Sequence, residues 1–209
     1  MKKNWVVKEH GDSVVIKQLM NSLDVSEPLA NLMVQRNISS FDEARSFFRP
    51  TFDSLHDPFL MKDMNIAVDR ISSAIDKNEK ILIYGDYDVD GTTSVALLYS
   101  FLQNFYTNID YYIPNRDKEG YGVSKLGLDY ARDTNCKLVI TIDCGIKAVD
   151  KVDYANSIGL DVIICDHHLP GDRIPDAVAV LDPKQAGCSY PYKELSGCGV
   201  GFKFIHAYS

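Results

Sequence analysis

Three short apolar runs, rich in β-branched residues, limit what this chain can fold into more than any other feature. They lie at 81–84, 138–142 and 161–165, and helical patterns separate them. An apolar run of this length, bounded by turn residues, is typical of a strand that is buried on both faces. Buried strands that alternate with helices indicate a parallel sheet connected by right-handed crossovers.

The same alternation continues on both sides of these runs. We predict two further strands, at 109–113 and 177–181, and helices over about 63–78, 92–105, 124–134 and 146–158. The fold class is therefore α/β, a mostly parallel sheet with helices on both faces, over residues 63–209. The last eight residues have the pattern of a helix without a stop signal, so we expect this domain to be incomplete at its C-terminus and the chain to be the N-terminal part of a longer protein.

Residues 1–62 have a different pattern, that of a small helical leader. Pro28 stands in the first turn of one expected helix, behind Ser26 as its N-cap. A second helix begins at Ser40, which forms a capping box with Glu43. We find no residues with recognisable chemistry in this leader and expect it to serve in packing or docking.

Composition sets the cellular context. The 209 residues, 45% hydrophobic, suffice for one α/β domain and an accessory segment. No apolar run approaches the roughly 20 residues that span a bilayer, and the first residues lack the apolar segment of a signal peptide. Five cysteines without paired spacing indicate reduced thiols, so we expect a cytoplasmic protein. The net charge of −7 argues against a basic nucleic-acid-binding face, unless bound metal offsets the acidic residues.

Acidic residues follow each of the three apolar runs. The first is followed by Asp86, Asp88 and Asp90, the second by Asp143, and the third by the triplet 166–168, Asp-His-His. In an open α/β sheet the carboxyl ends of the strands meet in one crevice, so these side chains should converge. So many carboxylates in one place require divalent cations, and we expect a metal-dependent hydrolase.

The segment 86–90 allows other interpretations. If it is extended, its three aspartates share a face, because alternate residues of an extended chain point the same way. The same spacing also begins an EF-hand loop, but that loop needs a glutamate at its twelfth position, where this chain has Leu97, and it follows a helix instead of a strand. A solvated acidic turn without metal is the remaining alternative.

Asp143 and the triplet 166–168 are the other candidate ligands. An aspartate at a strand end is often only a helix cap, but beside the other carboxylates we favour a ligand that bridges two cations. Adjacent histidines of an extended segment point to opposite sides, so we expect one of His167 and His168 to bind metal and the other to contact substrate. Asp166 can orient an imidazole. Mixed aspartate and histidine ligands favour Mn²⁺ or Mg²⁺.

Three weaker features complete the candidate site. Thr92 stands at the start of a helix whose free N–H groups suit a phosphate, although it fits ordinary capping equally well. Arg116, in a glycine-punctuated loop, is a candidate phosphate contact or simply a solvated side chain. The segment 196–201, SGCGVG, lacks the spacing of a dinucleotide-binding fingerprint, so we expect it to allow close helix packing.

In this order, the segments YGDYDVDG, IPNRDKEGYG, TIDCG, CDHH and SGCGVG resemble the DHH phosphoesterase family over essentially the whole chain. Within it, the long leader is similar to that of the exonucleases specific for single-stranded DNA. The resemblance implies hydrolysis of phosphodiester bonds in the 5′→3′ direction with two Mn²⁺ or Mg²⁺ ions, and a role in DNA repair and recombination. It also implies single-stranded DNA as substrate, with a single-stranded-DNA-binding protein and a repair helicase as partners.

The resemblance also assigns roles to residues. It implies Asp88, Asp90, Asp143 and His167 as metal ligands, with Asp86 in support and His168 on the scissile phosphate. One further metal-binding aspartate, and the domains that grip DNA, would lie beyond residue 209. Two alternatives stay open: a family member acting on oligoribonucleotides, cyclic dinucleotides or pyrophosphate, and a scaffold of the same fold without catalysis.

Overall fold

The chain forms two compact units, divided between Leu55 and His56. The computed structural model describes residues 4–209. The boundary expected after residue 62 lies inside the second unit, because Pro58 and Met61 are buried there; Met61 packs into the core of that unit. Among the described residues, no helix is long and apolar enough to cross a bilayer.

The first unit is helical, as expected. It contains α1 (Ser13–Leu23), α2 (Glu27–Val34), α3 (Phe41–Phe48) and a 3-10 turn, Phe52–Ser54. Six buried side chains form its core: Ile16, Leu19, Ala30, Met33, Ile38 and Ala44. The capping box of Ser40 and Glu43 begins α3, as the sequence predicts. Helix α1 was not predicted; Asp12 caps it, with 2.7 Å from Oδ1 to the backbone N of Val14.

The second unit contains a parallel five-stranded sheet, which confirms the predicted fold class. Its strands are β1 (Lys80–Gly85), β2 (Ile109–Tyr112), β3 (Cys136–Ile142), β4 (Asp161–Cys165) and β5 (Ala179–Leu181). Their order is β2-β1-β3-β4-β5, with every pair parallel. From β1 the chain goes outward to β2 and then returns to the other side of β1 as β3. The crevice between the carboxyl ends of β1 and β3 is the point where ligands bind in sheets of this type.

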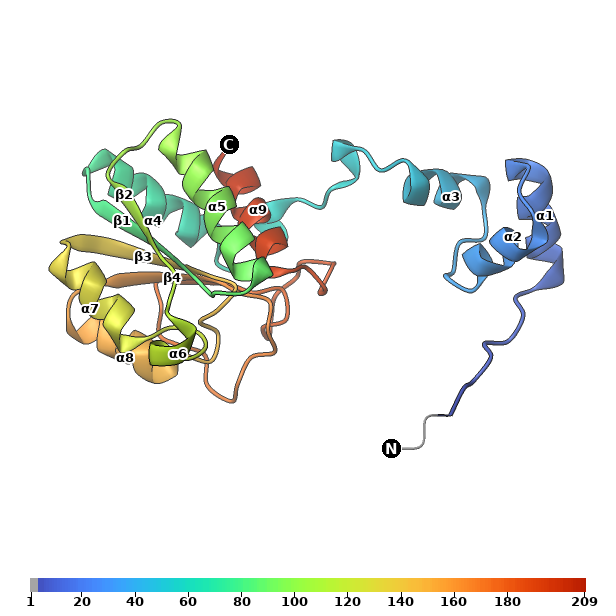
Figure 1. Ribbon diagram of the computed structural model, residues 1–209. Helices are drawn as coiled ribbons and strands as arrows, with labels where there is room; N and C mark the ends of the chain where they lie inside the picture. The colour runs from blue at the N-terminus through green and yellow to red at the C-terminus, as the bar shows by residue number, and fades with distance from the viewer. Residues whose placement is uncertain (1–3) are drawn as a thin grey trace. The chain divides into compact units, whose positions relative to one another are not determined.

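Helices cover both faces of this sheet (Figure 1). On one face lie α4 (Met64–Asp76), α5 (Val89–Gln103) and α9 (Gly197–Tyr208); on the other lie α7 (Lys125–Asp133) and α8 (Val149–Ser157). Alternate residues of β1 enter the two cores, because Ile81 and Ile83 pack on the first face and Leu82 and Tyr84 on the second. A 3-10 turn, Pro58–Leu60, precedes α4, and a short helix, α6 (Arg116–Glu119), interrupts the glycine-punctuated loop.

Two glycines of SGCGVG, Gly197 and Gly201, allow close packing, as predicted. A Cβ atom on Gly201 would lie 2.5 Å from Cδ1 of Ile142, so α9 approaches β3 more closely than a side chain would allow. No strand leads into this segment in the described chain, as a dinucleotide fingerprint would require. All five cysteines are free thiols. Burial raises the pKa of Cys144 and Cys165, which keeps both thiols protonated.

Candidate metal centre

A buried aspartate directly follows four of the five strands. Asp86 follows β1, Asp143 follows β3, Asp166 follows β4 and Asp182 follows β5. Their side chains are almost completely removed from water, with 0, 2, 1 and 0% of each residue exposed. Carboxylates are rarely buried unless hydrogen bonds, cations or metals compensate their charge. The hydrogen-bond partners of these four carboxylates, or their lack of partners, therefore indicate whether the crevice can bind a cation.

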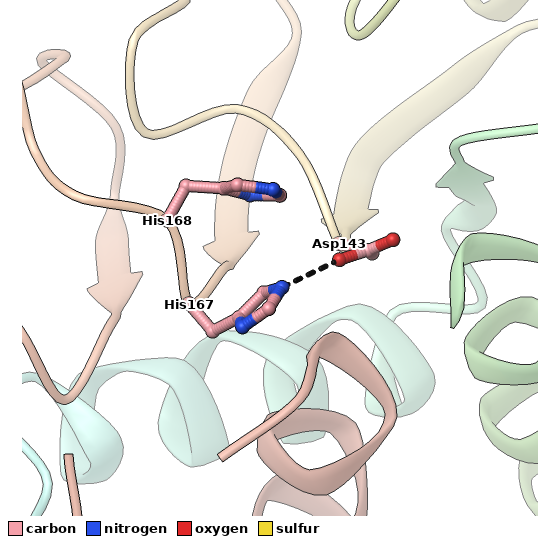
Figure 2. Close-up of side chains that lie close together, drawn as sticks. All are labelled: Asp143, His167 and His168. Atoms are coloured by element: carbon pink, nitrogen blue, oxygen red, sulfur yellow. Dashed lines mark ion pairs between the residues drawn. The ribbon is translucent and has the colours of Figure 1, made fainter. Parts of the chain in front are cut away.

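Asp143 has a backbone that few residues can adopt. Its φ of 61° lies in the left-handed region, which only glycine, asparagine and aspartate enter readily. Its N–H donates a hydrogen bond to the carbonyl of Cys165 on β4, with 2.9 Å from N to O. This turn directs the side chain away from the end of β3 and toward the loop after β4, where the two histidines lie (Figure 2).

Asp143 and His167 approach each other as two ligands of one cation would. Oδ1 of Asp143 lies 3.1 Å from Nε2 of His167 (Figure 2). It nevertheless accepts no hydrogen bond of acceptable geometry from residues 4–209. Two ligand atoms that are each about 2.1 Å from a cation and at right angles to each other stand about 3 Å apart. Oδ2 of Asp90 lies 3.7 Å from the same nitrogen, and one ligand atom each of Asp143, His167 and His168 lies within 4.8 Å of the others.

The electrostatics of Asp143 also favour a cation. Burial, followed by repulsion from Asp90 and Asp88, raises the pKa of Asp143 to about 7. Burial, with a smaller effect from the charge of Asp88, raises the pKa of Asp86 as well. The nearby N–H groups of Tyr87 and Gly122 oppose this shift, although neither carboxylate oxygen of Asp86 accepts a hydrogen bond of good geometry from the described residues. A divalent cation would remove this cost by favouring the charged forms. The donor set of oxygens and an imidazole nitrogen fits Mn²⁺ or Mg²⁺.

The expectation that residues 86–90 are extended was wrong, so the alternation that would place the three aspartates on one face does not apply. The segment is not extended, because Asp88 caps α5 by accepting a hydrogen bond from the N–H of Gly91 (2.9 Å), and Asp90 is already helical. As a result Asp86 is buried, Asp88 is exposed and Asp90 is half-buried. The helix therefore begins three residues before the predicted start at Thr92. The EF-hand alternative is excluded, because the segment follows strand β1 instead of a helix and residue 97 is a leucine without a carboxylate.

The two histidines lie side by side, although they were expected on opposite sides. Their ring centroids are 4.5 Å apart. The cause is Asp166, whose Oδ1 accepts hydrogen bonds from the backbone N–H groups of His167 (2.7 Å) and His168 (3.2 Å) and so bends the chain after β4. Their contacts still differ. His167 faces Asp143, whereas Nδ1 of His168 lies 2.7 Å from Oδ1 of Asp166.

Hydrogen bonds compensate the buried charge of Asp166, whereas Oδ1 of Asp143 has none from the described residues. Its Oδ2 accepts a hydrogen bond from the N–H of Ile146, at 2.9 Å. Burial alone would raise the pKa of Asp166, but the hydrogen bonds from His168 and Ile146 lower it below its ordinary value. The hydrogen bond to Asp166 in turn raises the pKa of His168. This pair therefore favours an ionised carboxylate beside a protonated imidazole.

The glycine-punctuated loop reaches the same crevice. The hydroxyl of Tyr121 lies 3.1 Å from Nε2 of His168, and the guanidinium of Arg116 lies 5.4 Å from the ring centre of Tyr87. Arg116 is exposed. The hydroxyl of Thr92, by contrast, donates to the carbonyl of Asp88 at 2.7 Å, which is ordinary capping geometry.

Two residues of this crevice were not predicted from the sequence. Tyr121 stands between Gly120 and Gly122, whose φ angles of 79° and 80° turn the loop toward the site. Asp182 has one oxygen bound by the N–H of Lys184 (2.7 Å), and the other has no partner among the residues described here. Burial raises the pKa of Asp182 to about 6. The signal for Asp182 was present, since it follows an apolar strand as the other aspartates do.

The description "DHH family, N-terminal domain" matches residues 80–209. This chain belongs to the DHH family. Two curated DHH relatives are both named single-stranded-DNA-specific exonuclease RecJ. That of Bacillus subtilis is 44% identical over 206 residues, 99% of this chain and 26% of the relative. That of Escherichia coli is 41% identical over 142 residues, 68% of this chain and 25% of the relative.

Solved structures agree with this assignment. The exonuclease RecJ bound to manganese superposes with a TM-score of 0.65 at 30% identity, over 71% of this chain and 37% of that one. RecJ from Thermus thermophilus in complex with Mn²⁺ gives a TM-score of 0.76 at 23% identity, over 96% of this chain and 28% of that one. At this identity the likeness supports the fold alone. The chain spans about a quarter of the length of the two curated DHH relatives.

Proposed function

We propose that this chain is the metal-binding part of an enzyme that hydrolyses single-stranded DNA from its 5′ end. The observation that carries this proposal is the pair formed by Oδ1 of Asp143 and Nε2 of His167, 3.1 Å apart without a hydrogen bond from the described residues to Oδ1. Relatives named single-stranded-DNA-specific exonuclease support the choice of substrate.

The candidate ligands are four residues and one supporting aspartate. Asp88, Asp90, Asp143 and His167 would hold two Mn²⁺ or Mg²⁺ ions, with Asp143 shared between them and Asp86 in support. Ions bound there would polarise the scissile phosphoryl group and lower the pKa of a water molecule for in-line attack. Asp143 is buried, with 2% of the residue exposed, and its left-handed backbone fixes the direction of the side chain.

His168 would act on the phosphate. Asp166 holds Nδ1 at 2.7 Å, which directs Nε2 toward the hydroxyl of Tyr121 and away from Asp166. Because the pKa of His168 is raised, the ring stays protonated further toward neutral pH and can donate to a phosphate oxygen as negative charge develops. Arg116 and the N-terminus of α5 near Thr92 are candidates for neighbouring phosphates of the strand.

The cellular setting follows from the same proposal. We place the enzyme in the cytoplasm, in DNA repair and recombination, with a single-stranded-DNA-binding protein and a repair helicase as partners. The repair role and the partners come from the likeness to the exonucleases, whereas the cytoplasmic location comes from the five cysteines without paired spacing.

Asp143→Ala in the complete natural protein tests the proposal. Hydrolysis of 5′-labelled single-stranded DNA with saturating Mn²⁺ should be abolished, while the circular dichroism spectrum stays close to that of the wild type. Asp172→Ala, at an exposed aspartate, is the matched control and should keep full activity. Retained hydrolysis by Asp143→Ala would refute the role of Asp143. Faster turnover of short RNA or pyrophosphate than of DNA would reassign the substrate.

A further inference from the structure

Helix α9 begins directly against the candidate metal centre. The first N–H groups of a helix have no partner within the helix and must be satisfied from outside. At α9 the side chain of Ser196 accepts from the N–H of Gly199, at 3.1 Å. The N–H groups of Gly197 and Cys198 both donate to Asp90, at 2.8 Å to Oδ2 and 2.8 Å to Oδ1. Both carboxylate oxygens of Asp90 therefore contact the N-terminus of α9, the positive end of the helix dipole.

The same helix start touches a second carboxylate. A Cβ atom on Gly197 would lie 2.4 Å from Oδ1 of Asp143 and 2.5 Å from its Cβ. Gly197 does not have a left-handed backbone, so glycine is needed here for its missing side chain. Oδ1 of Asp143 is also the buried atom that accepts no hydrogen bond from the part of the chain described. The bare Cα of Gly197 thus provides the space that this oxygen occupies.

Helix α9 is held firmly in this position. Val200 and Phe204 are buried in the core that also includes β3 and α5, and Gly201 packs on Ile142, the residue before Asp143. Nζ of Lys203 donates to the carbonyl of His56 at 2.7 Å. The helix start is therefore a fixed surface to which two carboxylates from different parts of the chain are fitted.

We propose that the start of α9 is a positioning element of the metal centre, with Gly197 and the N–H of Cys198 as its essential features. The two N–H groups fix the direction of Asp90 and leave each oxygen a lone pair for a cation. The absent side chain of Gly197 lets Asp143 lie next to Asp90. Both residues would act through the carboxylates that they contact. This inference rests on the proposed function.

Gly197→Ala and Gly199→Ala in the complete natural protein form a matched test. The two glycines lie two residues apart in the same turn, but a Cβ on Gly199 would meet nothing closer than Cδ2 of Leu195 at 3.3 Å. After treatment with EDTA, each variant is titrated with Mn²⁺ by calorimetry. We expect Gly197→Ala to bind Mn²⁺ about 10–100-fold more weakly, as for other residues that orient metal ligands, and Gly199→Ala to bind as the wild type does.

The outcomes separate this inference from the proposed function. Wild-type affinity in Gly197→Ala would overturn the inference, even with a lowered melting temperature, because glycine would then serve packing only. A wild type that binds no Mn²⁺ would overturn the proposed function and the inference with it. Weaker binding by Gly197→Ala alone, with an unchanged circular dichroism spectrum, would support both.

A second pair of variants decides the matter if Gly197→Ala fails to fold. Cys198→Pro removes the N–H that donates to Asp90, and Cys198→Ala keeps it. Proline is accepted at the second position of a helix in this same chain, at Pro28 of α2. We expect the proline variant to bind Mn²⁺ at least about tenfold more weakly than the alanine variant. Equal affinity of the two would overturn the role of this N–H.

Discussion

Asp143→Asn should make the metal-free protein more stable at alkaline pH and at the same time remove cation binding. Asparagine has nearly the same shape as aspartate and is among the few residues that tolerate the left-handed backbone of position 143, where φ is 61°. The substitution therefore removes the charge and leaves the geometry. Burial and the charges of Asp90 and Asp88, which oppose ionisation of Asp143, then no longer destabilise the fold.

The magnitude follows from the pKa of Asp143, which rises from 3.8 to about 7 on folding. Below about pH 4 the carboxyl of Asp143 is protonated in both the folded and the unfolded protein, so it has no effect on stability. Between about pH 4 and pH 7 the unfolded chain has lost a proton that the folded chain retains, so stability falls as the pH rises. Above about pH 7 the cost is constant. A rise of this size corresponds to about 4 kcal/mol, and we expect about 2–4 kcal/mol after relaxation of the surroundings.

Urea denaturation in EDTA at about pH 5 and about pH 8 measures this effect. The free energy of unfolding of Asp143→Asn should exceed that of the wild type by about 2–4 kcal/mol at the higher pH and by about two-fifths of that at the lower. Asp172→Asn, at an exposed position, should change stability by less than about 0.5 kcal/mol at both. Mn²⁺ at a hundredfold excess over its dissociation constant should add about 2.7 kcal/mol to the wild type alone. Equal or lower stability of Asp143→Asn at about pH 8 would refute the reasoning.

Two further substitutions test the surroundings of the site. The hydroxyl of Tyr84 donates to the carbonyl of Gly122 (2.9 Å) and accepts from the N–H of Ser124 (3.0 Å), so Tyr84→Phe should cost about 1–3 kcal/mol in urea denaturation. An unchanged unfolding midpoint would mean that the loop does not depend on these bonds. Asp166→Asn should lower the pKa of His168, measured by NMR titration of the imidazole, because Asp166 is the main cause that raises it; the same pKa in both proteins would contradict this.

The fold was largely predictable because its central strands are buried on both faces. Such strands are continuous apolar runs, and 138–142 and 161–165 lie within the observed β3 and β4. Helix α1 was missed although the side chains that form its apolar face recur at helical spacing: Val15, Ile16, Leu19, Met20 and Leu23. Ends of elements were less predictable, since the start of α5 depends on one hydrogen bond from Gly91 to Asp88.

The members of the candidate site were more predictable than their arrangement. Strand-end aspartates follow from the pattern, but the direction of His167 and His168 depends on the turn that Asp166 makes with their N–H groups. The contact of Asp90 with Gly197 joins residues 107 positions apart, and no spacing rule predicts it. Which residues bind metal stays a prediction.

The left-handed backbone of Asp143 also restricts how a descendant of this protein could lose the proposed activity. A gene copy no longer selected for hydrolysis would accumulate substitutions, and those that unfold the domain would be removed. At position 143 the fold accepts asparagine or glycine at little cost, whereas a β-branched residue would have to adopt a strained conformation. Inactive descendants that survive as binding scaffolds should therefore carry mainly asparagine or glycine there, and their histidine positions should vary freely.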